Sequence, residues 1–157
     1  MNRFVKGLLL CSVLLTTGAK AATRYSFALA SRQKLITYTI SGVEEASIPK
    51  QNELFNTGHY GPCLKITIRN NSNAPIELAM PTGTTLFPDQ GKYQQMIVTE
   101  DYSVELVAHG STNDKIFAMC AQPFKLSPDV QAFYKVGELA EKKTVSVAKI
   151  IDDMDLQ

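Results

Sequence analysis

Tryptophan is absent from the chain, and only two histidines and three cysteines are present. Metal sites usually combine several His, Cys or carboxylate ligands at characteristic spacings, and no such cluster occurs in this sequence. The acidic residues Asp152, Asp153 and Asp155 lack the spacing and the turn glycine of an EF-hand calcium loop. The sequence therefore predicts neither a metal nor any other cofactor.

An excess of positive charge is also missing, since the chain has 16 basic and 15 acidic residues. Removal of an N-terminal signal carrying Arg3, Lys6 and Lys20 would leave 13 basic and 15 acidic residues, a net charge of about −2. A protein that binds nucleic acid needs a basic face. We therefore predict no nucleic-acid partner.

Recognisable catalytic motifs are missing too. The chain has no Gly-x-Ser-x-Gly sequence, and residues 81–85 lack the lysine and the following helix of a phosphate-binding loop. The neighbouring acids Glu44 and Glu45 would point apart in a helix or a strand. We predict a protein that is not an enzyme, and a hydrolase or carbohydrate-processing enzyme with an unrecognised site remains an alternative.

The first 21 residues have the three parts of a secretory signal. Two basic residues precede an apolar run at positions 8–15, which is too short for the ~20 residues that span a bilayer. An Ala-x-Ala pattern ends at Ala21, so cleavage is expected after Ala21, with Ala22 as the alternative. The mature protein would be periplasmic, extracellular or held at the cell surface, with no membrane span.

One cysteine, Cys11, lies inside this signal. Leu10 stands where a bacterial lipoprotein has a small residue before its acylated cysteine, so we expect Cys11 to be removed with the signal. Lipidation at Cys11 is the alternative.

Removal of Cys11 would leave an even pair, Cys63 and Cys120, which predicts one disulfide in an exported protein. Its ends are 57 positions apart in the sequence, so such a bridge would stabilise the fold by ~4 kcal/mol. Two buried free thiols are the alternative.

Residues 62–126 read as an antiparallel β module. Leu64, Ile66 and Ile68 alternate with polar residues, which is typical of a half-buried strand. Similar strands are expected at 76–80, 96–99, 104–108 and 115–121, and the last of these should be central. The pattern predicts a mainly β protein with an immunoglobulin-like sandwich. Cys63 has the wrong parity for its strand, so either Pro62 resets the chain or Cys63 lies at a strand end.

Residues 22–61 form a lead-in with a short helix at 26–34, an extended segment or strand at 35–40 and a long loop at 42–61. The aromatic end of this loop is the predicted contact surface, and the turn after residue 80 is a second candidate. The predicted binding residues are Phe55, His59, Tyr60, Thr82 and Thr84.

Residues 127–157 are expected to form an amphipathic helix that covers the sandwich. Ser127 and Pro128 suit its first positions, and a break is expected near Gly137 or Lys143.

Several of these segments resemble a poorly characterised group of exported bacterial proteins with immunoglobulin-like β-sandwich domains. The resemblance rests on Gly-Pro-Cys-Leu-x-Ile-x-Ile-x-Asn at 61–70, Met-Pro-Thr-Gly-Thr at 80–84, Gln-Gln-Met-Ile-Val-Thr at 94–99, and Ala-Met-Cys at 118–120 followed by Pro123 and Pro128. It covers roughly residues 26–157 and implies a fold rather than an activity.

Together these observations predict an exported, non-enzymatic binding or scaffolding module of the bacterial cell envelope. Its partner would be a protein or a glycan of the envelope. A structural unit that assembles with another domain or subunit is a further alternative.

Overall fold

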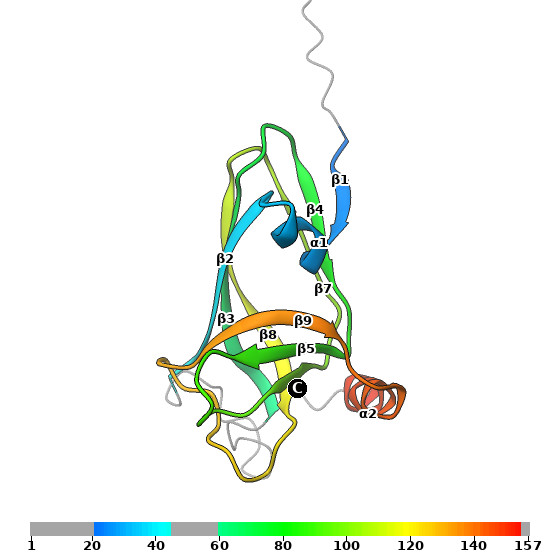
Figure 1. Cartoon of the computed structure of the whole chain (residues 1–157). Coiled ribbons are helices and arrows are strands. Elements are labelled where there is room, and N and C mark those ends of the chain that lie inside the picture. Colours follow the sequence, from blue (N-terminus) through cyan, green and yellow to red (C-terminus); the bar gives the residue numbers. More distant parts are fainter. Residues whose placement is uncertain (1–20, 45–59, 155–157) are drawn as a thin grey trace, which may run out of the picture.

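The structure, a computed structural model, describes residues 21–44 and 60–154 (Figure 1). The described residues form two helices and nine strands, in the order β1 (Thr23–Ser26), α1 (Phe27–Arg32), β2 (Ile36–Gly42), β3 (Tyr60–Asn70), β4 (Ile76–Met80), β5 (Thr84–Pro88), β6 (Met96–Val98), β7 (Tyr102–Leu106), β8 (Ser111–Cys120), β9 (Phe133–Leu139) and α2 (Lys142–Asp153). The predicted signal and most of the predicted loop at 42–61 lie outside the described residues. No helix within the described ranges is both long and apolar enough to cross a membrane.

Six of the strands close into a barrel in the order β2-β3-β8-β6-β5-β9. The other three form a small sheet in the order β1-β4-β7, at the upper end of the molecule in Figure 1. The prediction of a mainly β protein is confirmed. The arrangement differs from the predicted immunoglobulin-like sandwich, because β9 joins β5 to β2 and closes a ring where a sandwich would leave two separate sheets.

Strand β3 has the predicted alternation. Leu64, Ile66 and Ile68 are fully buried, and Lys65 and Thr67 between them are exposed. The strand pairs with β2 along one edge and with β8 along the other, so it lies at the centre of the barrel wall.

A β-bulge explains why Cys63 breaks the parity of β3. The register between β3 and β8 shifts between Gly61 and Leu64, so that Cys63 and Leu64 are both buried. Gly61 adopts a φ of 107°, a conformation that side chains other than glycine rarely take. The interpretation that the chain is reset at Pro62 is therefore confirmed.

Helix α1 matches the predicted helix at 26–34. Ser26 caps it by accepting a hydrogen bond from the Leu29 N–H at 3.3 Å, and Phe27 and Ala30 face the core. The chain then continues as β2, where an extended segment or strand was expected. The Phe27 and Tyr38 rings pack edge to face with their centroids 4.9 Å apart, and this contact packs the helix against the strand.

The remaining strands agree with the sequence in part. Strands β4, β6, β7 and β8 lie where strands are predicted, and β8 pairs with β3 on one side and β6 on the other, as every strand of the closed ring has two neighbours. Strand β8 is buried mainly through Ile116 and Ala118, on one face rather than on both. In β5, Leu86 is buried, whereas Phe87 is half exposed and lies over Gly137 of β9.

The predicted helix starting at Ser127 is wrong over its first half. Residues 133–139 form strand β9, and the helix begins only at Lys142. Tyr134 of β9 is buried while Phe133 and Lys135 on either side of it are exposed, which is the alternation of a strand. The sequence analysis missed this alternation because the apolar residues of the segment also fit a helical spacing. Helix α2 packs through Ala148 and through Val145, which lies against Gly83.

Candidate binding surface

The predicted binding residues fall into three groups. Phe55 and His59 lie outside the described residues. Tyr60 starts β3, is half-buried and lies opposite Met119, at the lower end of the barrel in Figure 1.

Thr82 lies in the turn before β5 and Thr84 is the first residue of β5, and both are buried. The Thr84 hydroxyl donates to the Pro81 carbonyl at 2.6 Å, and the Thr82 hydroxyl donates to the Thr99 carbonyl at 3.4 Å. These contacts give both side chains a part in the turn, and their role in binding stays a prediction.

The lower end of the barrel carries a well-anchored loop of residues 121–132, between β8 and β9, which we call the Phe124 loop. The Leu126 N–H donates to the Lys92 carbonyl at 3.0 Å, and the Gln94 N–H donates to the Leu126 carbonyl at 3.1 Å. Tyr93 and Leu126 form an isolated parallel bridge between these two segments. Main-chain hydrogen bonds therefore hold the middle of the loop.

A second anchor lies near the end of the loop. The buried Tyr93 ring places its hydroxyl 2.7 and 2.9 Å from the two carboxylate oxygens of Asp129. This hydrogen bond is the main cause that holds the pKa of Asp129 below its usual range. The Ala132 N–H donates to the Asp129 carbonyl, and the Gly42 N–H donates to the Ala132 carbonyl, so the loop is also tied to β2.

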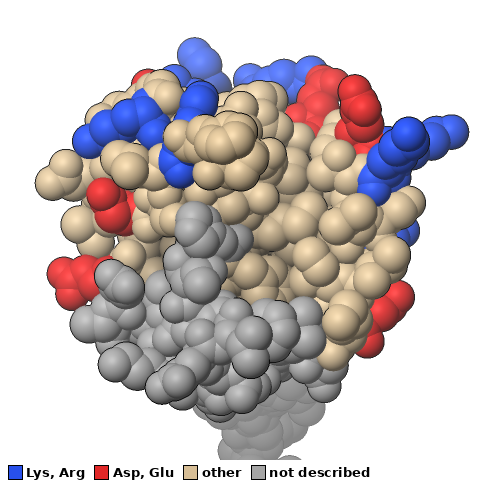
Figure 2. All heavy atoms as spheres, turned by 90° about the horizontal axis from the view of Figure 1, so that it is seen from below, with Lys and Arg blue, Asp and Glu red and all other residues tan. Residues whose placement is uncertain are grey.

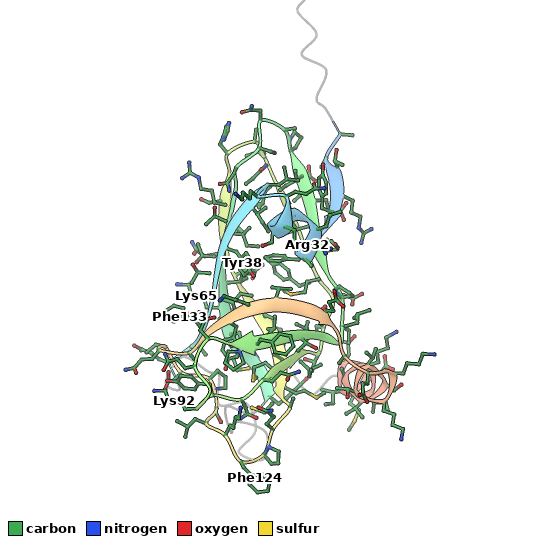
Figure 3. The ribbon with its side chains drawn as sticks, in the orientation of Figure 1. Arg32, Tyr38, Lys65, Lys92, Phe124 and Phe133 are labelled. Atoms are coloured by element: carbon green, nitrogen blue, oxygen red, sulfur yellow. The ribbon has the colours of Figure 1, made fainter. Side chains whose placement is uncertain are left out.

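The loop nevertheless exposes apolar side chains. Phe124 is 98% exposed, Leu126 is 56% exposed and Val130 is 50% exposed. Phe124 points away from the barrel at the lower tip of the molecule (Figure 3). Seen from below, most of the visible described surface is uncharged and the charged side chains lie around its rim (Figure 2). A fixed loop that holds a fully exposed aromatic ring is typical of a binding surface.

The sequence analysis missed this loop because it divided residues 121–132 between the sheet and the helix. Two features could have identified it. Pro123 lies within the segment and disfavours the interior of a strand or a helix, and Phe124 and Leu126 are apolar residues that fit neither periodicity.

A hollow lies in the barrel wall between α1, β2 and β9. It has a volume of about 650 Å³ and is lined by Tyr38, Ile40, Phe133 and Val136, among others. A second hollow of about 250 Å³ lies further along β9, between α1, β4 and β9, where Phe27, Arg32 and Glu138 line it, and Val136 borders both hollows. Figure 3 shows Arg32 and Tyr38 on the α1 side of β9.

The two cysteines of the predicted disulfide lie on adjacent strands, Cys63 in β3 and Cys120 in β8. The Cys63 thiol donates to the carbonyl of Ala118 at 3.5 Å. Burial raises the pKa of Cys63 to about 12, helped by the neighbouring Cys120, and burial also raises the pKa of Cys120 to about 12. Protonated thiols are poor nucleophiles, so this site gives no support to cysteine catalysis at neutral pH.

The disulfide stays a prediction. In the exported protein we expect both thiols to alkylate only after reduction, as read from the intact mass with and without reductant. Reduction should lower the free energy of unfolding by up to ~4 kcal/mol, because the 57-residue separation closes a long loop in the unfolded chain. Thiols that alkylate in denaturant without reductant would contradict the bridge. A Cys63→Ala/Cys120→Ala variant is the control, since reductant should not change its stability.

Across the described ranges, no cluster of three or more His, Cys, Asp or Glu side chains is arranged to hold a metal ion. Comparison of the chain with family models, with curated proteins and with solved structures found no match.

Proposed function

We propose that the protein is an exported, non-enzymatic binding module of the bacterial cell envelope, and that it contacts its partner through the lower end of the barrel. The observation that carries the proposal is the Phe124 loop, where a fully exposed aromatic ring is held by hydrogen bonds on both sides. Loops anchored on a rigid scaffold are the usual place for recognition, and aromatic residues dominate binding energy.

The predicted contact residues adjoin the same end. Tyr60 starts β3 opposite Met119, only two residues before the Phe124 loop begins. The partner would be a protein or a glycan, since aromatic rings serve both. The resemblance to exported bacterial domains agrees with this proposal and is part of it.

Replacing Phe124 with serine is expected to weaken partner binding at least tenfold without changing the melting temperature, because the ring is exposed and makes little contact within the fold. The measurement is recovery of bound envelope proteins and glycans by the tagged, exported protein, alongside thermal unfolding. Val107→Ser is the matched control, since Val107 is exposed beside the turn between β7 and β8, away from the Phe124 loop. Equal recovery by both variants, or a large loss of stability in Phe124→Ser, would contradict the proposal.

A second function, assembly with another domain or subunit, has one observation in its favour. Val147, Ile150 and Met154 are exposed at intervals of three and four residues and form an apolar stripe on α2. Concentration-dependent dimerisation of the purified protein that Ile150→Glu abolishes would support this alternative.

A further inference from the structure

The β2–β9 join is one of the two shortest in the barrel, since β2–β9 and β5–β6 each have only two paired positions. Strand β2 pairs with β3 over all seven of its residues, yet it pairs with β9 only at Ile40 with Tyr134 and Ser41 with Phe133. Beyond Tyr134, the remainder of β9 has β5 on one side and, within the described residues, no strand on the other. The two strands therefore diverge and leave two open edges that face one hollow.

Main-chain groups point into this hollow from both edges. Alternate residues of a strand direct their N–H and C=O groups to the same side. The Gly42 N–H donates towards β9, so the main-chain groups of Ile40, Tyr38 and Ile36 face that side as well. In the described part of the chain, neither Tyr38 nor Ile36 pairs with a strand there.

On the opposite edge, a side chain takes the place of a strand. The Val136 N–H donates to the Tyr38 hydroxyl at 3.1 Å, where a carbonyl of a neighbouring strand would otherwise accept it. The Tyr38 hydroxyl therefore accepts from the Val136 N–H, the donor that would otherwise pair with an added strand. An added strand would have to break this hydrogen bond and turn the Tyr38 ring away from Phe27, so the phenol competes with the strand for the Val136 N–H.

The walls of the two hollows suit an extended peptide. Ile40 and Val136 provide apolar surface in the hollow beside β2, and Phe27 provides it in the second hollow further along β9, so a strand laid along β9 would meet apolar surface in both. Arg32 at the end of α1 and Glu138 near the end of β9 line this second hollow, and no ion pair joins them among the described contacts. Lys135 is different, since it already pairs with Asp89 at 3.3 Å.

We propose that these two hollows bind one extended peptide segment of another protein, which adds as a strand between β2 and β9. The segment would carry apolar residues at alternate positions and an acidic residue opposite Arg32. This site is separate from the Phe124 loop and goes beyond the function proposed above.

The test starts from a random peptide library displayed on phage, panned on the mature protein. The most enriched peptide is synthesised with a fluorophore, and its dissociation constant is measured by anisotropy. We expect Arg32→Glu to weaken binding about fivefold or more, and a peptide with its acidic residue changed to lysine to regain affinity for that variant. Lys115→Glu, at an exposed position of β8 outside both proposed sites, is the matched control and should leave the affinity unchanged.

Tyr38→Phe gives a second, more specific result. Loss of the phenol frees the Val136 N–H for the peptide, so affinity should rise about fivefold. Failure to enrich any peptide above the Arg32→Glu background would overturn the proposal, and so would weaker binding by Tyr38→Phe. Peptides that lose affinity for Phe124→Ser but not for Arg32→Glu would also overturn it, while leaving the function of the Phe124 loop intact.

Discussion

Replacing Asn70 with alanine is expected to lower the free energy of unfolding by about 3 kcal/mol, and replacing it with aspartate by about 4 kcal/mol at neutral pH. Asn70 ends β3 and is completely buried. Its amide nitrogen lies 2.9 Å from the Ala74 carbonyl, 3.2 Å from the Leu106 carbonyl and 2.9 Å from the Val107 carbonyl. One side chain thus connects the turn after β3 with the end of β7 and with the turn that follows β7.

The acceptor side of the same amide is used as well. The Asn70 Oδ1 atom accepts from the Ser72 N–H at 2.9 Å and from the Ser72 hydroxyl at 2.8 Å. Alanine would remove this acceptor from the Ser72 N–H and the amide donor from the Leu106 and Val107 carbonyls, and each buried polar group left without a partner costs about 1–3 kcal/mol. Aspartate is worse, because it places a carboxylate oxygen where the amide donor faced three carbonyls.

The measurement is urea unfolding at pH 7, followed by circular dichroism. Asn73→Ala is the control, since Asn73 is exposed and its side chain contacts only His109 among the interactions described, and it should change stability by less than about 0.5 kcal/mol. An aspartate variant as stable as the alanine variant would show that the donor geometry at position 70 contributes little.

Replacing Gly42 with alanine is expected to destabilise the protein by about 3 kcal/mol or more, because the added methyl group overlaps main-chain atoms. A Cβ atom at position 42 would overlap the carbonyl oxygen of Asp129 and would lie 2.6 Å from its nitrogen. Main-chain atoms cannot rotate aside as a side chain can. The clash would push the Phe124 loop away from β2 and break the hydrogen bond from Gly42 to Ala132.

Gly91→Ala is the matched control for this experiment. A Cβ atom at position 91 would meet no atom within 4 Å, so this substitution should change stability by less than about 0.5 kcal/mol. Thermal unfolding of both variants gives the comparison. Equal stability of the two variants would mean that the loop accommodates the methyl group and that its contact with β2 is loose.

The strands that were predicted correctly share a short-range signal. Leu64, Ile66 and Ile68 alternate with polar residues, and that pattern directly reports one buried face. Helix α1 has a short-range signal as well, because the Ser26 cap and the two buried residues three positions apart, Phe27 and Ala30, lie within a few residues of one another.

The missed features depend on partners far along the chain. Strand β9 closes the barrel, but its exposed Phe133 and its Gly137, packed under Phe87, blur the alternation on which sequence reading relies. Strand β1 is polar, and only its parallel pairing with β4 makes it a strand. A sandwich and a closed barrel contain the same alternating segments, so the choice between them depended on whether β9 exists. The Phe124 loop was missed for the same reason, because its hydrogen bonds reach back to residues 92–94.

The late position of β9 also bears on how the chain reaches its destination. The ring cannot close until Tyr134 meets Ile40, which lies 94 residues earlier. Pairing over such a distance is slow to form, because a long loop must first be closed. If the protein is exported as proposed, nearly the whole chain would pass through the secretion channel before the barrel could lock. The barrel would then close only after β9 had emerged on the far side of the membrane, while pairs between earlier strands, such as β2 with β3, could form before it.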